Sequence, residues 1–332
     1  MANELKSLSD AIRYFANDQV CIDTVASMRW PNGPACPACA AVADRQHWLK
    51  TQKRFQCRDC GKQYSVKVNT IFEDSAIKLD KWLTAMWMLA NCKNGISSYE
   101  VASAVGITQK SAWFMMHRIR EAMKNKSVMK MGNTGGAVEV DETFVGGKPR
   151  NMHKSRRLKI ARIQSEYAET SNTQGRSGKT AVMGMYDRES RQVRATVVPN
   201  VKRESLQNEI LNHIVHGSTV YTDEAVSYNA LREKYIHETV NHTEAYVRGQ
   251  IHTNCLENFG SLTKRTLRGT YVAVEPFHLD RYVDEQAFRF NNRHTKDNPL
   301  DDTDRFMLAL SQISGRRLTY AELTGKVGNP AF

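Results

Sequence analysis

The stretch VEVDETFV, residues 138–145, decides the fold of the second half of the chain. Its apolar β-formers alternate with polar residues, which predicts a β-strand that ends beside an acidic pair. After this stretch the sequence shows further strand-like runs and helices. Together with residues 138–145 they have the order β-β-β-α-β-α, followed by a last strand. This order predicts an α/β domain with a mixed five-stranded sheet flanked by helices. The expected strands are 137–145, 180–186, 193–198, 220–222 and 236–241, with a helix over 202–215 and another after residue 222.

Three acidic residues occupy positions typical of a two-metal site. Asp141 lies in the opening stretch, Asp223 ends the strand-like run in TVYTDEA, and Glu257 opens a helix in HTNCLENFGSLTKR. Clustered carboxylates repel one another unless a cation neutralises them, so they predict a site for a pair of Mg²⁺ or Mn²⁺ ions. Lys264 follows on the helical stripe of Glu257 and is expected to face the same cleft.

Other acids compete for these roles. Asp284 and Glu285, in HLDRYVDEQAFRFNNR, are the main competitors for the third ligand. Glu142 directly follows Asp141 and is expected to point elsewhere, as a neighbour of the ligands. An aspartate at a strand end is also a common turn former, so each acid alone is weak evidence.

Four of the seven cysteines form two Cys-x-x-Cys pairs separated by seventeen residues. Cys36, Cys39, Cys57 and Cys60 therefore have the spacing of a zinc ribbon with one tetrahedral Zn²⁺. Four protein ligands leave no position for water, so the ion is expected to be structural. The module would present a group of basic side chains to a phosphate backbone or a partner: Lys50, Lys53, Arg54 and Arg58.

The stretch SSYEVASAVGITQKSAWFMMHRIREAM, residues 97–123, reads as helix, turn at Gly106, helix. Small residues flank the turn, and Thr108 is expected to cap the second helix, as in a helix-turn-helix. The alternative is an ordinary helical pair. In the DNA-binding interpretation, base edges would meet Gln109, Lys110 and Ser111, and phosphates would meet Arg118 and Arg120.

Composition points to a polyanionic partner. The 332 residues include 47 Lys and Arg against 35 Asp and Glu, for a net charge of +12 and a pI near 9.4. This balance favours nucleic acid or an anionic surface. The sequence has no long apolar run and no signal-peptide pattern at its start, so a cytoplasmic location is expected.

Several motifs together resemble the ISXO-like group of bacterial insertion-sequence transposases. They are RWPNGPACPACA, SVKVNTIFEDSAIKLDKWLTAMWMLA, the helical stretch above, VEVDETFVGGKPRN and LDRYVDEQAFRFNNR. The resemblance implies a zinc ribbon, a helix-turn-helix and a ribonuclease-H-like domain with an Asp-Asp-Glu-type triad. It carries the catalytic roles to Asp141, Asp223, Glu257 and Lys264. Some relatives use asparagine as the third ligand, which makes Asn254 a second candidate.

Two departures from the family pattern stand near this site. Gly260 replaces an aromatic residue, and Val272 replaces a histidine. Glycine within a helix is expected to cost about 1 kcal/mol relative to alanine. The activity of this copy is therefore a separate question from its ancestry.

The expected organisation is multidomain. It comprises a helical lead-in (1–30), a zinc ribbon (31–72), an all-α helix-turn-helix (73–126), a linker (127–136), the ribonuclease-H-like domain (137–295) and a C-terminal tail (296–332).

The expected function is DNA transposition: binding of terminal inverted repeats, Mg-assisted cleavage of the element ends, and joining of the 3′-hydroxyls to target DNA. Lys264 and Arg265 would hold phosphate near the scissile bond. The partners would be double-stranded DNA and further copies of the chain, at least a dimer in the synaptic complex, at the bacterial nucleoid. The alternatives are a catalytically inactive DNA-binding regulator and a metal-dependent nuclease without strand transfer.

Overall fold

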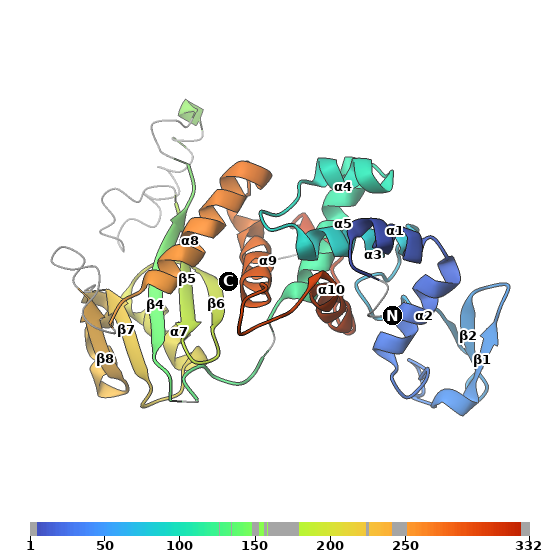
Figure 1. Ribbon diagram of the computed structural model, residues 1–332, viewed down its shortest axis with the longest axis horizontal. Coiled ribbons are helices and arrows are strands. Elements are labelled where there is room, and N and C mark those ends of the chain that lie inside the picture. The colour runs from blue at the N-terminus through green and yellow to red at the C-terminus, as the bar shows by residue number, and fades with distance from the viewer. Residues whose placement is uncertain are drawn as a thin grey trace. The chain divides into compact units, whose positions relative to one another are not determined.

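The computed structural model describes residues 5–125, 127–133, 135–147, 153–155, 158, 179–223, 226–240 and 251–326. The chain divides into two compact units (Figure 1). Unit 1 comprises Met1–Lys124 and Asn292–Phe332, and unit 2 comprises Asn125–Asn291. In the described part of the chain, no helix is both long enough and apolar enough to cross a bilayer.

Unit 1 contains a small antiparallel sheet beside the four cysteines. Its strands are β1 (Gln46–Leu49), β2 (Arg54–Cys57) and β3 (Gln63–Tyr64), in that order, after a 3₁₀ turn η1 (Ala43–Arg45). The rings of Trp30, Phe55 and Tyr64 pack together against the sheet. This is the architecture of a zinc ribbon, as the cysteine spacing predicts.

The helical lead-in is two helices, α1 (Leu8–Phe15) and α2 (Asp18–Arg29). The break has a local cause, since the Asn17 side chain accepts a hydrogen bond from the Gln19 backbone N–H at 2.9 Å. An asparagine at this position is a strong helix N-cap, so a new helix begins there.

The next three helices are α3 (Leu79–Asn91), α4 (Ser98–Val105) and α5 (Gln109–Met123). Gly106 ends α4 at φ +62°, and Thr108 caps α5 by accepting from the Ser111 N–H, as the sequence predicts. Glycine adopts this left-handed conformation without steric cost. The result is two helices joined by a three-residue turn.

The C-terminal segment differs from the expected tail, because it is part of the core of unit 1. It forms α10 (Asp302–Ser311) and α11 (Tyr320–Leu323). The Phe306 ring lies 5.5 Å from Phe15 and 5.4 Å from Trp87. The Ile71 N–H donates to Ile313 O at 3.2 Å. A short helix with apolar side chains is stabilised by packing of this kind, and here the packing partners lie far away in the sequence.

Unit 2 is built on a mixed five-stranded sheet in the order β6-β5-β4-β7-β8. β4 pairs antiparallel with β5 and parallel with β7, and β8 is parallel to β7. All five predicted strands form. Their bounds are β4 (Val138–Val145), β5 (Thr180–Asp187), β6 (Gln192–Val198), β7 (Thr219–Asp223) and β8 (Ile236–Val240).

Helices cover both faces of this sheet (Figure 1). On one face, α7 (Arg203–His213) and the 3₁₀ helix η4 (Val226–Glu233) pack on Val138, Val140 and Met183. On the other face, α8 (Asn254–Thr266) and α9 (Leu279–Asn291) pack on Tyr186 and Val193. Two short elements join α8 to α9: the π-helix η5 (Leu267–Tyr271) and the 3₁₀ helix η6 (Pro276–His278). This layered architecture is consistent with a ribonuclease-H-like domain.

Candidate active site and zinc centre

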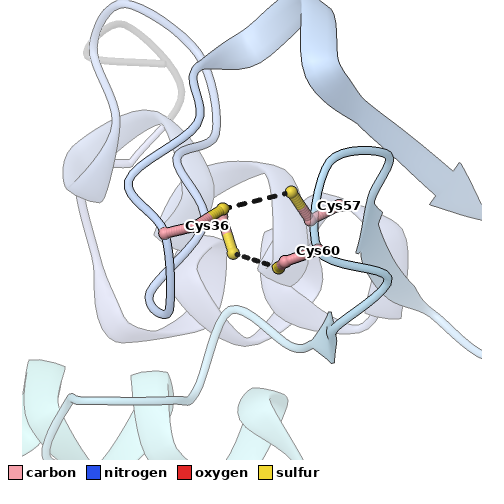
Figure 2. A group of neighbouring side chains, drawn as sticks. Cys36, Cys57 and Cys60 are labelled. Atoms are coloured by element: carbon pink, nitrogen blue, oxygen red, sulfur yellow. Dashed lines mark hydrogen bonds between the residues drawn. The ribbon is translucent and has the colours of Figure 1, made fainter.

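The four cysteine thiols of unit 1 converge on one point. The sulfurs of Cys36 and Cys60 lie 3.6 Å apart, and those of Cys39 and Cys57 lie 3.5 Å apart. Figure 2 shows Cys36, Cys57 and Cys60 turned toward one another. Zn–S bonds of about 2.3 Å in a tetrahedron require sulfur separations of about 3.8 Å. The geometry therefore fits a four-coordinate structural Zn²⁺.

Two equivalent turns build this centre. The Ala40 N–H donates to Cys36 O and the Gly61 N–H donates to Cys57 O, each at 2.9 Å, and both donor residues have positive φ. In the second turn, the backbone N–H of Cys60 lowers the pKa of the Cys57 thiol to about 6. A thiol with such a pKa is largely thiolate at neutral pH, the form that binds Zn²⁺.

The acids Asp141 and Asp223 meet in unit 2 because of strand register. Val138 is opposite Val220 and Glu139 is opposite Tyr221 in the parallel pair β4 and β7. Continuing this register sets Asp141 opposite Asp223, since neighbouring strands run about 4.8 Å apart. Their carboxylate oxygens lie within 4.8 Å of one another and of a Glu142 oxygen. Hard oxygen donors this close fit a divalent cation.

Glu142 is thus part of the carboxylate cluster, whereas the sequence predicted that it points elsewhere. Its Oε1 accepts a hydrogen bond from the Tyr228 hydroxyl, which comes from η4. Burial, reinforced by the nearby Glu142 charge, raises the pKa of Tyr228 well above its usual value, so the phenol stays a donor. The pleat sets Glu142 on the other face from Asp141, and only the long side chain held by Tyr228 brings its carboxylate back.

The third predicted ligand, Glu257, lies in the first turn of α8 and is exposed. In the described chain, Glu257 does not belong to the group of carboxylates that lie within 4.8 Å of one another, which comprises Asp141, Glu142 and Asp223. Its direction follows from the helix: Cys255, Phe259 and Leu262 pack toward α9 and β6, at one edge of the sheet. At 100° per residue, Glu257 and Lys264 project from the opposite side of α8, away from α9.

A buried ionic network fixes the start of α8. The carboxylate of Glu139 is fully buried; it accepts from Arg188 Nε at 2.8 Å and from the Cys255 backbone N–H at 3.1 Å. A terminal NH₂ of Arg188 also donates to His252 O at 3.0 Å. Thr253, the N-cap residue, makes no side-chain cap. Glu139 therefore supplies the helix cap from the neighbouring strand, two residues before Asp141.

Comparison with known proteins agrees with both centres. Residues 133–291 match the ISXO2-like transposase domain, and residues 16–63 match the transposase zinc-ribbon domain. A transposase-like protein of Haemophilus influenzae, itself uncharacterized, is 31% identical over 105 residues, which cover 31% of this chain and 85% of that protein. The chain belongs to the ISXO2-like transposase family. An uncharacterized protein in transposable element ISH50 of Halobacterium salinarum is 25% identical over 264 residues, 77% of this chain and 85% of that protein.

Two glycines let α8 of the transposase lie close to the sheet. A Cβ on Gly260 would come within 2.3 Å of Thr143 Oγ1 on β4, and a Cβ on Gly184 of β5 would come within 2.9 Å of Leu256. Gly260 was expected only to weaken its helix. The structure shows instead that the residue allows the close approach of α8 to β4, which carries Asp141.

The alternative third ligands have different surroundings. Glu285 is fully buried on α9, where it pairs with Arg289 and accepts from the Tyr271 hydroxyl at 2.5 Å. These partners neutralise its charge within the core, so Glu285 has a structural role. Asn254 is the exposed first residue of α8, one turn before Glu257. Helix geometry therefore keeps Asn254 open as a candidate beside Glu257.

Two of the predicted phosphate contacts are wrong. Arg118 and Arg120 are only 5% and 1% exposed. The Arg118 guanidinium donates to Glu73 O at 2.5 Å and lies over the Trp82 ring. Burial lowers the pKa of Arg118. Residues 117–120 of α5 are all buried, so other parts of unit 1 cover the helix on every side there, and both arginines lie in the core and cannot reach a DNA backbone.

The remaining residues of the predicted recognition surface lie at the start of α5. Lys110 is exposed, with its ammonium 5.0 Å from the Tyr320 ring. Gln109 donates to Ser98 Oγ at 2.8 Å, which ties α5 to α4. The Ser111 hydroxyl interacts with the Thr108 cap. Arg265 is exposed on α8 of unit 2, next to Lys264.

Proposed function

We propose that this transposase is a DDE-type enzyme that cleaves DNA at the ends of its insertion sequence and joins the new 3′-hydroxyls to target DNA. The observation that carries the proposal is the meeting of Asp141, in the middle of β4, with Asp223, at the end of the adjacent parallel strand β7. The family match over the same domain supports it. Glu257 completes the set in this proposal, because its helix α8 packs on β4, the strand that carries Asp141.

Each residue has a distinct task in this mechanism. Asp141, Asp223 and Glu257 would hold two Mg²⁺ or Mn²⁺ ions, which when bound would supply positive charge to stabilise the oxygens of a phosphodiester displacement. Lys264, two turns along α8 from Glu257, holds a phosphate of the substrate strand, with Arg265 beside it. Water attacks first and frees a 3′-hydroxyl. That hydroxyl then attacks a phosphodiester of target DNA, forms a new P–O bond and displaces the target strand's 3′-oxygen, which leaves as a 3′-hydroxyl, so no covalent protein intermediate is needed.

DNA-end recognition is assigned to unit 1. The exposed Lys110 at the start of α5 and the partly buried Gln109 and Ser111 beside it meet the terminal inverted repeat, and the zinc ribbon adds basic contacts. Joining two ends of one element requires at least two copies of the chain on the DNA. The reaction takes place on DNA in the cell that carries the element.

Labelled inverted-repeat ends incubated with Mg²⁺ and a target plasmid test the proposal. Asp141→Asn is expected to abolish both cleavage and joining and to leave end binding nearly intact, while Glu204→Gln, an exposed change on α7, keeps all three. Glu257→Gln should match Asp141→Asn, and Asn254→Ala should remain active. Normal cleavage by Asp141→Asn would refute the assignment.

The wild-type protein separates the other functions in the same assay. Binding without cleavage would identify a DNA-binding regulator. Cleavage without joining would identify a metal-dependent nuclease.

A further inference from the structure

A second cleft lies beside the candidate active site, within unit 2. It has a volume of about 470 Å³, in the range of ligand sites. Its walls are the end of β4, the start of β5, and the chain from the last turn of α8 to α9. The lining residues used below are Val145, Lys264, Leu267, Arg268, Val272 and Pro276.

The charge and polarity of the cleft match a nucleotide. Lys264 and Arg268 are one helical turn apart and supply two cations at the wall. Glu275 and His153 also line the cleft, so it is not uniformly basic. The rest of the wall is largely apolar, as a site for a flat heterocyclic base requires. A nucleotide whose phosphate binds the two cations and whose base packs against the apolar wall would contact both the charged and the apolar part of the cleft.

Val272 at the rim has an unusual conformation. It sits at φ +60° and ψ −59°, a region that β-branched residues rarely adopt, and the Ala273 N–H donates to Tyr271 O at 2.6 Å across it. Its side chain is 79% exposed. Burial of the side chain in the core therefore does not compensate for the unfavourable backbone conformation of Val272. Strained backbone of this kind gathers at ligand clamps, and apolar side chains held outward can separate stacked bases.

The position of the cleft relative to the acids sets which nucleotide it receives. Lys264 is seven residues beyond Glu257, about 10 Å along the helix. Val145 is four residues beyond Asp141, about 13 Å along the strand. A DNA strand rises about 3.4 Å per nucleotide, so the cleft lies about three or four nucleotides from the scissile phosphate.

We infer that this cleft binds one unstacked nucleotide of the DNA strand about three or four positions from the cleavage point, with Val272 as the wedge that separates it from its neighbour. Lys264 and Arg268 hold its phosphate. The inference rests on the proposed function, because it uses DNA in the adjacent active site. It adds a place where the duplex is opened locally.

The test uses the full-length protein carrying Asp141→Asn, so that DNA is bound and not cut. A fluorescent adenine analogue, which brightens when unstacked, is placed singly at each position on both sides of the scissile phosphate. We expect the signal to rise at about three or four positions from it. Val272→Ala should remove the rise, whereas Val128→Ala, the same change at an exposed site outside the cleft, should keep it.

The charge contribution is measured separately by salt titration of end binding. Arg268→Gln should reduce the slope of log affinity against log salt by about 1, as expected for one lost phosphate contact. Arg191→Gln, in the exposed β5–β6 turn at the far end of β5, should leave the slope unchanged. Matching circular dichroism and thermal transitions verify that each variant is folded.

Two results would overturn the inference and differ in what they say of the proposed function. A flat signal at every position, with end binding by this protein and cleavage by the wild-type chain both intact, removes the nucleotide site and leaves the transposase mechanism standing. Failure of the wild-type chain to bind or cut element ends removes both.

Discussion

The buried carboxylate of Glu139 offers the sharpest test of how the site is assembled, through the change Glu139→Gln. Both oxygens of Glu139 accept hydrogen bonds, one from Arg188 and one from the Cys255 N–H. Glutamine has a single acceptor, so its NH₂ group must face one of these donors. Breaking a buried ion pair costs about 3–5 kcal/mol, and because the Arg188 side chain is 20% exposed we expect the lower end, about 3 kcal/mol.

The loss of stability in Glu139→Gln should appear locally, at the start of α8. An energy of about 3 kcal/mol corresponds to roughly a hundredfold increase in the opening equilibrium of the helix. Native-state hydrogen exchange of the α8 amides measures this increase directly. Strand cleavage should fall with it, since α8 carries Glu257, while end binding by unit 1 is retained. Glu189→Gln, an exposed change in the adjacent turn, is the matched control.

Unchanged protection of α8 in Glu139→Gln, relative to Glu189→Gln, would refute this reasoning. It would mean that the apolar contacts of Leu256 and Phe259 hold the helix without the ionic network.

The remaining predictions concern packing and metal. Gly260→Ala is expected to destabilise unit 2 by about 1 kcal/mol, because overpacking of about 1–3 kcal/mol against Thr143 exceeds the gain in helix propensity of about 1 kcal/mol. Thermal unfolding measures the change. Gly269→Ala lies in the helical segment η5, where an added Cβ meets nothing within 4 Å, so it should not destabilise and should show the gain in helix propensity alone. An equal loss of stability in both variants would contradict the close packing. Cys57→Ser, or a strong chelator, should release one zinc per chain and unfold the ribbon, seen by metal analysis and by loss of the Trp48 environment. Retention of full zinc by Cys57→Ser would exclude the four-thiolate centre.

The main elements of the fold could be predicted because each leaves a local periodic signal. Strand alternation in VEVDETFV, the cysteine spacing and the glycine turn before Thr108 all depend on residues close in sequence. The structure accordingly contains the five-stranded sheet of unit 2, four thiols that converge on one point, and a pair of helices of which the second is capped by Thr108. The place of the C-terminal helix α10 in the core of unit 1 leaves no such local signal, since the partners of its Phe306, Phe15 and Trp87, lie more than two hundred residues earlier.

The sequence by itself determined which residue types meet: four thiols, and two aspartates on neighbouring strands. Only the tertiary structure decided how side chains are shared between packing and chemistry. It buries Arg118, returns Glu142 to the acids through Tyr228, and caps α8 with Glu139 from a strand 116 residues away. Periodicity assigns a residue to a face of its own element. What the residues on that face contact, whether solvent, an ion partner or a helix end, depends on how the elements pack against one another. That packing leaves no local signal in the sequence.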